Sequence, residues 1–216
     1  MQLKGITVDF LGDSITEGCG TSGDGYRFVD VFARKTGAIT RNHGIGGTRI
    51  ARQIKPSQYP VWDLNYIDRA DDLDPNAQVI VVFGGTNDFG HGDAPLGDPA
   101  DGGEYTFYGA MKSLITRIVN RYPNAEIVIM TPLHRCSELV TTNEIGLPCA
   151  PLREFVNAEK IVAAQYSVPV LDLWSVSGIQ PSIEISKQTY MPDGLHPCDK
   201  GCERIVSRLI GFLSAL

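Results

Sequence analysis

The sequence predicts an α/β fold: a three-layer sandwich in which helices cover both faces of a parallel sheet. Strand-like and helix-like segments alternate along nearly the whole chain, which is the pattern of βα units around a parallel sheet. Residues 78–83 form a continuous apolar run, as expected of a central strand that is buried on both faces. The chain has 216 residues and no internal repeat or linker, so we expect a single domain over 1–216.

Five segments are expected to be strands. They are short and rich in β-branched or aromatic residues, such as Ile6, Val8 and Phe10 in the first of them. Arranged in the order 2-1-3-4-5, they form the five-stranded parallel sheet of a flavodoxin-like fold. In chain order the predicted strands are 5–11, 38–42, 78–83, 126–131 and 168–173.

Five further segments have the spacing of amphipathic helices, with apolar residues three or four positions apart. Met111, Leu114 and Ile118 show this spacing and are expected to face the core. Gly37 is a stop signal after the first of these helices. In chain order the predicted helices are 26–36, 61–70, 105–121, 151–166 and 200–214.

Four long connections interrupt this alternation, and loops of such length in a compact domain are usually functional. They span 43–60, 84–104, 133–150 and 174–196. Each follows a predicted strand. They therefore belong to the carboxyl edge of the sheet, where open α/β proteins bind their ligands.

Composition excludes several kinds of partner. The net charge is −6 and the basic residues form no cluster, which argues against nucleic acid or an anionic membrane surface. No apolar run approaches the roughly 20 residues that a membrane-spanning helix requires. Residues 1–5 lack the basic region and apolar stretch of a secretory leader, so a cytoplasmic protein is expected. The sequence does not indicate the oligomeric state.

The five cysteines do not form a disulfide scaffold, and their odd number leaves at least one free thiol. Cys136 and Cys149 bracket one loop, and Cys198 and Cys202 are four residues apart, so either pair could form a bridge in an exported protein. We expect all of them to be reduced. Paired CxxC and HxxxH motifs are absent, so no zinc site is expected.

Four short motifs concentrate glycine with serine, asparagine, aspartate and histidine. They are Gly12-Asp13-Ser14, Asn42-His43-Gly44-Ile45-Gly46-Gly47, Gly84-Gly85-Thr86-Asn87-Asp88 and Asp193-Gly194-Leu195-His196-Pro197. In the predicted strand order, strands two and three flank strand one. The second and third motifs are therefore expected on either side of Ser14.

These motifs, in this order, resemble those of the SGNH hydrolases, also called the GDSL family of esterases and lipases, over nearly the whole chain. The resemblance implies that Ser14 is the nucleophile of a serine esterase. It implies that His196 is the general base and then the general acid, and that Asp193 orients its imidazole. It also implies an oxyanion hole made of the backbone N–H groups of Ser14 and Gly47, Gly47 being favoured over its neighbour Gly46, and of the Asn87 amide. No metal and no cofactor are expected.

Elementary chemistry supports these roles. A serine hydroxyl is a poor nucleophile until a base removes its proton, and His196 can take that proton while the oxygen attacks an ester carbonyl. Preorganised amide donors then stabilise the negative charge that develops on the carbonyl oxygen. Because Asp193 and His196 are three residues apart, one short loop can hold the carboxylate against the ring.

The sequence indicates the substrate less clearly than the mechanism. The expected cleft loops are polar and rich in glycine, and no long apolar lid segment is present. We therefore expect a small-molecule ester substrate, with a short acyl group such as acetyl on a carbohydrate or another small polar carrier. A lysophospholipase or thioesterase that acts on longer acyl chains is the alternative.

Several motifs have structural or competing interpretations. Residues 14–17 fit a capping box, with Ser14 as the N-cap and Glu17 as its partner. Residues 18–23 spell GxGxxG, the dinucleotide fingerprint, although they follow the predicted strand too late for it. Asp88, His91 and Asp93 could suggest a metal site, but we expect Asp88 to cap local backbone amides.

Taken one at a time, several of the remaining residues do not distinguish an enzyme from a binding module. Gly47 and Asn87 could be turn residues, and Asp193 with His196 could be a surface pair. Trp62 and Trp174 are expected in the core or in a cleft wall, where either could stack on a sugar ring. A non-enzymatic binding module on the same sheet predicts a broken triad, whereas every part of the triad is present.

Overall fold

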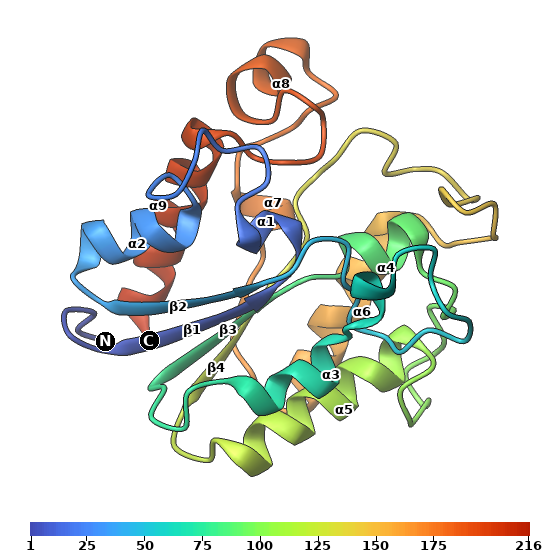
Figure 1. Cartoon of the computed structure of the whole chain (residues 1–216), viewed down its shortest axis with the longest axis horizontal. Coiled ribbons are helices and arrows are strands. Elements are labelled where there is room, and N and C mark those ends of the chain that lie inside the picture. Colours follow the sequence, from blue (N-terminus) through green and yellow to red (C-terminus); the bar gives the residue numbers. More distant parts are fainter.

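The computed structural model describes residues 1–216. One sheet of five parallel strands runs through its centre, in the order β2-β1-β3-β4-β5 (Figure 1). This order and the parallel pairing confirm the predicted fold class. In chain order the strands are β1 (Thr7–Gly12), β2 (Ile39–Gly44), β3 (Val79–Phe83), β4 (Glu126–Met130) and β5 (Val170–Leu171).

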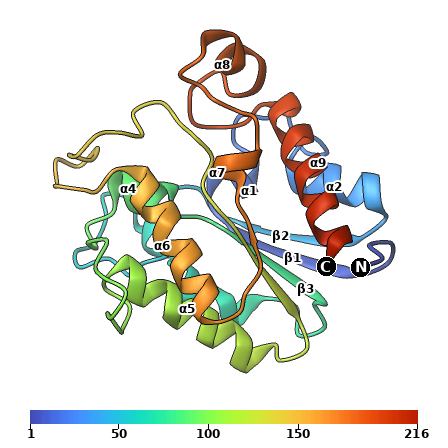
Figure 2. The ribbon, with the colours of Figure 1, turned by 180° about the vertical axis from the view of Figure 1, so that it is seen from behind.

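Helices cover both faces of the sheet, and each face has its own apolar core. One core packs α2 (Phe28–Thr36) and α9 (Asp199–Ala215) against the sheet, and the other packs α5 (Phe107–Arg121) and α6 (Leu152–Gln165). Figure 2, from behind, shows α9 and α6 on opposite sides of the strands. The residues of β3 alternate between the two cores, which explains the continuous apolar run in the sequence.

The long predicted helices are confirmed, and local interactions explain where they begin and end. The Thr106 side chain accepts a hydrogen bond from the N–H of Gly109 and begins α5. Gly37, at φ 74°, ends α2 in the left-handed conformation that glycine adopts without strain.

The predicted helix over 61–70 is wrong as a continuous element. It is divided into a 3₁₀ turn (η1, Pro60–Asp63), α3 (Tyr66–Arg69) and a second 3₁₀ turn (η2, Ala70–Asp72). The Asn65 side chain accepts a hydrogen bond from the N–H of Asp68, so it caps a new helix in the middle of the predicted one.

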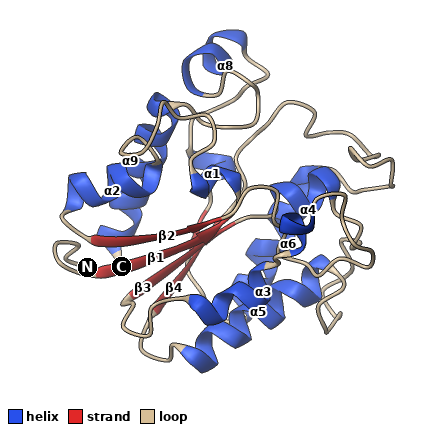
Figure 3. Cartoon of the chain, in the orientation of Figure 1, coloured by secondary structure: helices blue, strands red, loops and turns tan.

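Four short helices lie at the carboxyl ends of the strands or beyond them (Figure 3), and three of them fall wholly or largely within the predicted loops 84–104 and 174–196. The helix α1 (Ser14–Glu17) directly follows β1, and α4 (Thr86–His91) closely follows β3. The predicted strand 168–173 is reduced to two residues because Asp172 caps the next helix through the N–H of Ser175. The four helices are α1 (Ser14–Glu17), α4 (Thr86–His91), α7 (Leu173–Val176) and α8 (Glu184–Tyr190).

Two further observations concern the membrane and the cysteines. None of the helices combines the length and the apolar composition that crossing a membrane requires. All five cysteines are free, so neither of the two possible bridges is formed.

Candidate active site

Ser14 lies where β1 passes into α1, and it is largely buried, with 8% of its surface exposed. The preceding residue, Asp13, caps this helix: its carboxylate accepts a hydrogen bond from the N–H of Ile15 at 2.9 Å. The capping-box interpretation is therefore wrong, because Ser14 is not the N-cap. Glu17 does not reach back to the cap either, since its carboxylate accepts the N–H of Gly46 at 2.8 Å.

The Ser14 hydroxyl begins a chain of hydrogen bonds. Its Oγ lies 3.0 Å from Nε2 of His196, and Nδ1 of the same ring lies 2.7 Å from Oδ2 of Asp193. The other carboxylate oxygen of Asp193 accepts the N–H groups of Leu195 and His196, at 2.8 and 2.7 Å. This turn fixes the ring, which leaves Nε2 directed at the serine.

The same turn sets the charge state of Asp193. Partial burial opposes ionisation, but hydrogen bonds from the N–H groups of His196 and Leu195, and from the imidazole, lower the pKa of Asp193 below its ordinary value. The carboxylate is therefore ionised at neutral pH and can stabilise a positive charge on His196.

The GxGxxG segment supports the histidine from behind. Gly20 has φ 92°, and a Cβ atom at this position would lie 2.8 Å from Cβ of His196. Ser22 donates hydrogen bonds to the Asp199 carboxylate from its N–H at 2.9 Å and from its hydroxyl at 2.7 Å. These contacts explain the central glycine of the motif, Gly20, by packing, without any need for a nucleotide.

The segment after β2 lies beside Ser14 and offers one free amide. A Cβ atom at Gly46 would lie 3.6 Å from Cβ of Ser14. The N–H of Gly46 is engaged by Glu17, whereas that of Gly47 makes no hydrogen bond within the chain. Gly47 has φ 76°, and a Cβ atom there would overlap the indole of Trp62, so glycine is required on two grounds.

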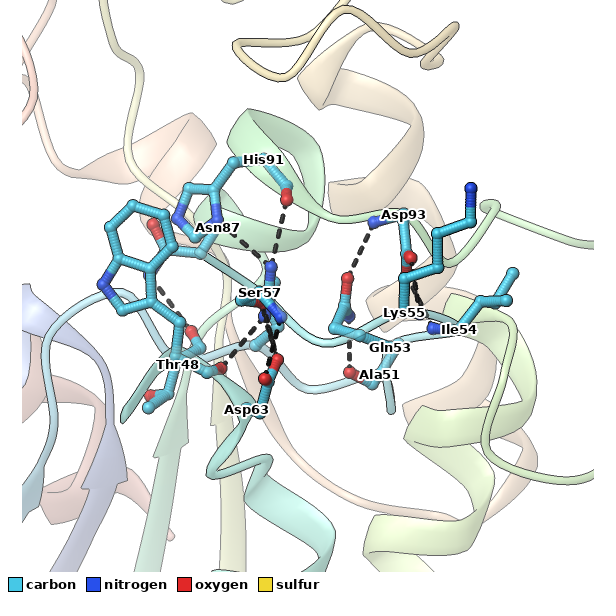
Figure 4. Close-up of polar contacts among 12 residues, drawn as sticks. Thr48, Ala51, Gln53, Ile54, Lys55, Ser57, Asp63, Asn87, His91 and Asp93 are labelled. Atoms are coloured by element: carbon cyan, nitrogen blue, oxygen red, sulfur yellow. Dashed lines mark hydrogen bonds and ion pairs between the residues drawn. The ribbon is translucent and has the colours of Figure 1, made fainter. Parts of the chain in front are cut away.

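Asn87 lies on the other side, in α4, and is 6% exposed. One hydrogen of its side-chain amide is donated to the carbonyl of Thr48 at 3.0 Å (Figure 4). An amide NH₂ group carries two hydrogens, so the second can be donated to a ligand. The bond to Thr48 fixes the amide plane and joins α4 to the loop after β2.

Asp88 braces this junction. Its two carboxylate oxygens accept the N–H groups of Ile50 and Ala51, at 3.0 and 2.9 Å. Its role is structural, as expected, but the amides that it holds belong to a remote loop and not to its own turn. Burial raises the pKa of Asp88 to about 6, against the effect of these two hydrogen bonds.

The residues of the possible metal site are engaged in other contacts. The Asp93 carboxylate accepts the N–H groups of Ile54 and Lys55, at 2.7 and 2.8 Å (Figure 4). His91 stacks on Trp62 with ring centroids 4.3 Å apart. No group of three or more His, Cys, Asp or Glu side chains in the structure is arranged to hold a metal ion.

Two buried ionisable residues next to the site were not identified from the sequence. Arg49 is 3% exposed and donates to the backbone carbonyls of His91 and Trp62, at 3.0 and 3.1 Å. Glu159, in α6, is fully buried, and a Cβ atom at Gly85 would lie 2.5 Å from its Oε1. Burial raises the pKa of Glu159 well above its ordinary value. A signal for Glu159 existed, because helical spacing places it on the apolar face of the predicted helix 151–166.

The comparisons with known proteins agree with this geometry. Residues 10–204 match the GDSL-like lipase/acylhydrolase family. A GDSL esterase/lipase of Arabidopsis thaliana is 28% identical over 204 residues, which cover 88% of this chain and 78% of that protein.

Solved structures share the fold along the full length. A protein from Lactobacillus plantarum superposes with a TM-score of 0.83 and 29% identity, covering 99% of this chain and 98% of that one. A two-domain esterase active on acetylated mannans shares the fold, with a TM-score of 0.61 and 18% identity over 98% of this chain and 50% of its own. The chain therefore belongs to the GDSL-like lipase/acylhydrolase family and is a hydrolase of carboxylic esters.

Proposed function

We propose that the protein is a serine esterase that removes a short acyl group, such as acetyl, from a carbohydrate or another small polar carrier. The observation that carries this proposal is the chain of hydrogen bonds from Asp193 through His196 to Ser14, at 2.7 and 3.0 Å. A nucleophile, a base and an orienting carboxylate in direct contact are the requirement for acyl transfer through a serine.

In the first half of the reaction, Ser14 Oγ attacks the ester carbonyl while His196 Nε2 accepts the hydroxyl proton. Asp193 accepts the hydrogen of Nδ1, which fixes the tautomer and stabilises the imidazolium. When the tetrahedral intermediate collapses, His196 gives the proton to the leaving alcohol. Water then attacks the acyl-enzyme with the same base, which releases the acid and restores Ser14.

The oxyanion hole in this proposal consists of the N–H groups of Ser14 and Gly47 and the second Asn87 amide hydrogen. The free N–H of Gly47 and the fixed plane of the Asn87 amide support the assignment. Such donors are held in place before the reaction, so they stabilise the developing charge without reorganisation.

A polar surrounding favours a small polar ester. Gly46 lies beside Ser14, and the segment that follows it, with Gly47 and Thr48, and the Asn87 amide bonded to Thr48 offer hydrogen-bonding groups and little apolar surface. The esterase from the comparisons that acts on acetylated mannans shares the fold, which makes an acetylated carbohydrate a reasonable first substrate to test.

A second candidate is a lysophospholipase or thioesterase activity on longer acyl chains. It is favoured by apolar side chains that are exposed on the loops around this edge of the sheet, notably Leu139 at 76%, Ile145 at 50% and Val61 at 45%. Both candidates use the same chemistry at Ser14 and differ only in the group that follows the carbonyl.

The test is hydrolysis of 4-nitrophenyl acetate by the wild type, Ser14→Ala and His196→Ala. Both variants are expected to lose about 10⁴-fold or more in kcat, since the members of a triad act as a unit. Ser207→Ala, at an exposed serine of α9, is the matched control. Equal rates for wild type and Ser14→Ala would end the proposal. Butyryl and octanoyl esters then separate the two candidates, because only the second predicts that rates rise with chain length.

A further inference from the structure

A cavity of about 310 Å³ lies next to the proposed oxyanion hole and has no role in the chemistry described above. Two contacts join it to the site: Trp62, one of its walls, packs against Gly47, and His91, another wall, lies one turn after Asn87 on α4. We propose that this cavity is a subsite for an uncharged, hydroxyl-rich, sugar-like part of the ester substrate. This inference rests on the proposed esterase function and specifies its substrate.

The walls of the cavity are held rigidly by one buried cation. The Arg49 guanidinium donates to the carbonyls of His91 and Trp62, at 3.0 and 3.1 Å, and pairs with the Asp63 carboxylate at 2.9 Å. Figure 4 shows the contacts around His91, Ser57 and Asp63 beside the bond between Asn87 and Thr48, with a separate group formed by Asp93, Gln53, Ile54 and Lys55. Because these groups are fixed without a ligand, the subsite is preformed.

His91 supplies a neutral hydrogen-bond donor to this cavity. Burial lowers the pKa of His91 to about 4, and the charge of Arg49 acts in the same direction, so the ring is neutral at pH 7. Nδ1 lies 3.3 Å from Nη1 of Arg49, which can only donate. Nδ1 is therefore the acceptor, and the single ring proton is on Nε2, which has no partner in the chain. This N–H fits a hydroxyl oxygen of a ligand.

The charges of the cavity favour a neutral ligand. Arg49 is balanced by Asp63, and Lys55 and Asp93 line the same cavity with opposite charges. The Asp93 carboxylate is already occupied by the N–H groups of Ile54 and Lys55. The two cations, Arg49 and Lys55, are matched in number by the carboxylates of Asp63 and Asp93, so the cavity has no net positive charge that would select an anion.

The apolar part of the lining fits a ring better than a long chain. Only Trp62, Ile145 and Leu147 are hydrophobic among the eleven lining residues. The Trp62 indole packs against His91 at a centroid distance of 4.3 Å and lines the cavity beside it. The exposed amide of Gln58 lies at the same cavity and adds donors and an acceptor. A small apolar lining among many hydrogen-bonding groups suits the C–H groups and the hydroxyls of a sugar.

The experiment compares two acetate esters. One is a mono-acetylated methyl glucoside with free hydroxyls, and the other is 4-nitrophenyl acetate, which has none. His91→Phe keeps an aromatic ring beside Trp62 but removes the Nε2 donor, together with the Nδ1 acceptor of Arg49, whose bond to the His91 carbonyl remains. We expect it to lower the ratio of the two kcat/KM values, glucoside over nitrophenyl, about 3- to 10-fold, through KM for the glucoside. His134→Phe is the matched control, because His134 stacks on Trp174 at 3.8 Å outside the cavity, and it should leave the ratio unchanged.

A binding measurement removes the dependence on turnover. The affinity of the Ser14→Ala protein for methyl glucoside can be measured by calorimetry. Adding His91→Phe to this protein should lower that affinity by the same factor. Gln58→Ala, at an exposed position that does not support the fold, should lower the ratio about threefold. An unchanged ratio in both His91→Phe and Gln58→Ala, with Ser14-dependent hydrolysis of 4-nitrophenyl acetate, overturns the subsite alone. Hydrolysis that does not depend on Ser14 overturns the proposed function instead.

Discussion

Substitution of Asn87 tests the proposed oxyanion hole most directly. Its amide has two hydrogens, of which one is donated to the Thr48 carbonyl at 3.0 Å and one is left for substrate. Asn87→Ala removes both. Loss of the second should lower kcat about 10²- to 10³-fold, which corresponds to about 3–4 kcal/mol of transition-state stabilisation. Loss of the first leaves a buried carbonyl without its partner and should lower the free energy of unfolding by about 1–3 kcal/mol.

The two effects are separated by assaying kcat and KM on 4-nitrophenyl acetate well below the melting temperature and by urea unfolding in parallel. Asn87→Asp is the sharper variant, since it keeps the shape of the side chain but cannot donate and places a negative charge beside the oxyanion. We expect its kcat to be lower than that of Asn87→Ala. If either variant raised KM at unchanged kcat, the amide would act on the ground state and the reasoning would be refuted.

Three other substitutions give independent checks. Gly47→Ala should lower kcat/KM and the free energy of unfolding, because its Cβ displaces Trp62 and φ is 76°; Gly146→Ala, at φ 79° with open space around it, should cost about 1–2 kcal/mol of stability without loss of activity. Burial raises the pKa of Asp13 from 3.8 to about 6, so the native state holds this proton longer than the unfolded state. The contribution of Asp13 to the free energy of unfolding should therefore fall by about 3 kcal/mol between about pH 3 and pH 7 and then level, and urea titrations of Asp13→Asn should lack this component. Glu159→Met should raise the melting temperature at pH 7 and stabilise the protein by about 1–3 kcal/mol, since it removes a buried carboxyl; a lower melting temperature would contradict this.

The centre of the sheet was predictable because the residues of β1, β3 and β4 are almost all buried, on both faces. The β3 residues alternate between two cores, so each of them must be apolar, and this produces a signal that is independent of neighbouring elements. Short elements gave no such signal. The helices α1, α4 and α7 have four to six residues, too few turns to show an apolar period. The helix predicted over 61–70 failed at Asn65, whose capping bond decides the local structure more strongly than the apolar spacing around it.

The motifs located the candidate site because parallel strands end at one edge of the sheet. Their chemistry and order place Ser14, Gly47 and Asn87 at neighbouring strand ends, and the structure brings His196 within hydrogen-bond distance of Ser14. The interactions of Arg49 could not be predicted, since its partners come from three separate segments and depend on how the loops fold over each other. The hydrogen bonds that Asp88 accepts from Ile50 and Ala51 could not be predicted for the same reason, because they join two segments that are far apart in the sequence.

Inactivation of the enzyme should depend on how the segment 196–199 is held. This segment packs against Gly20 through His196 and is bonded to Ser22 through Asp199. The imidazole belongs to the segment that enters α9, so its distance from Ser14 depends on α9 staying docked against the opposite end of the chain. In the proposed mechanism, a brief detachment of this terminal helix would switch off turnover while the strands remain paired. Mild heat or low urea should therefore abolish hydrolysis before circular dichroism reports any loss of secondary structure.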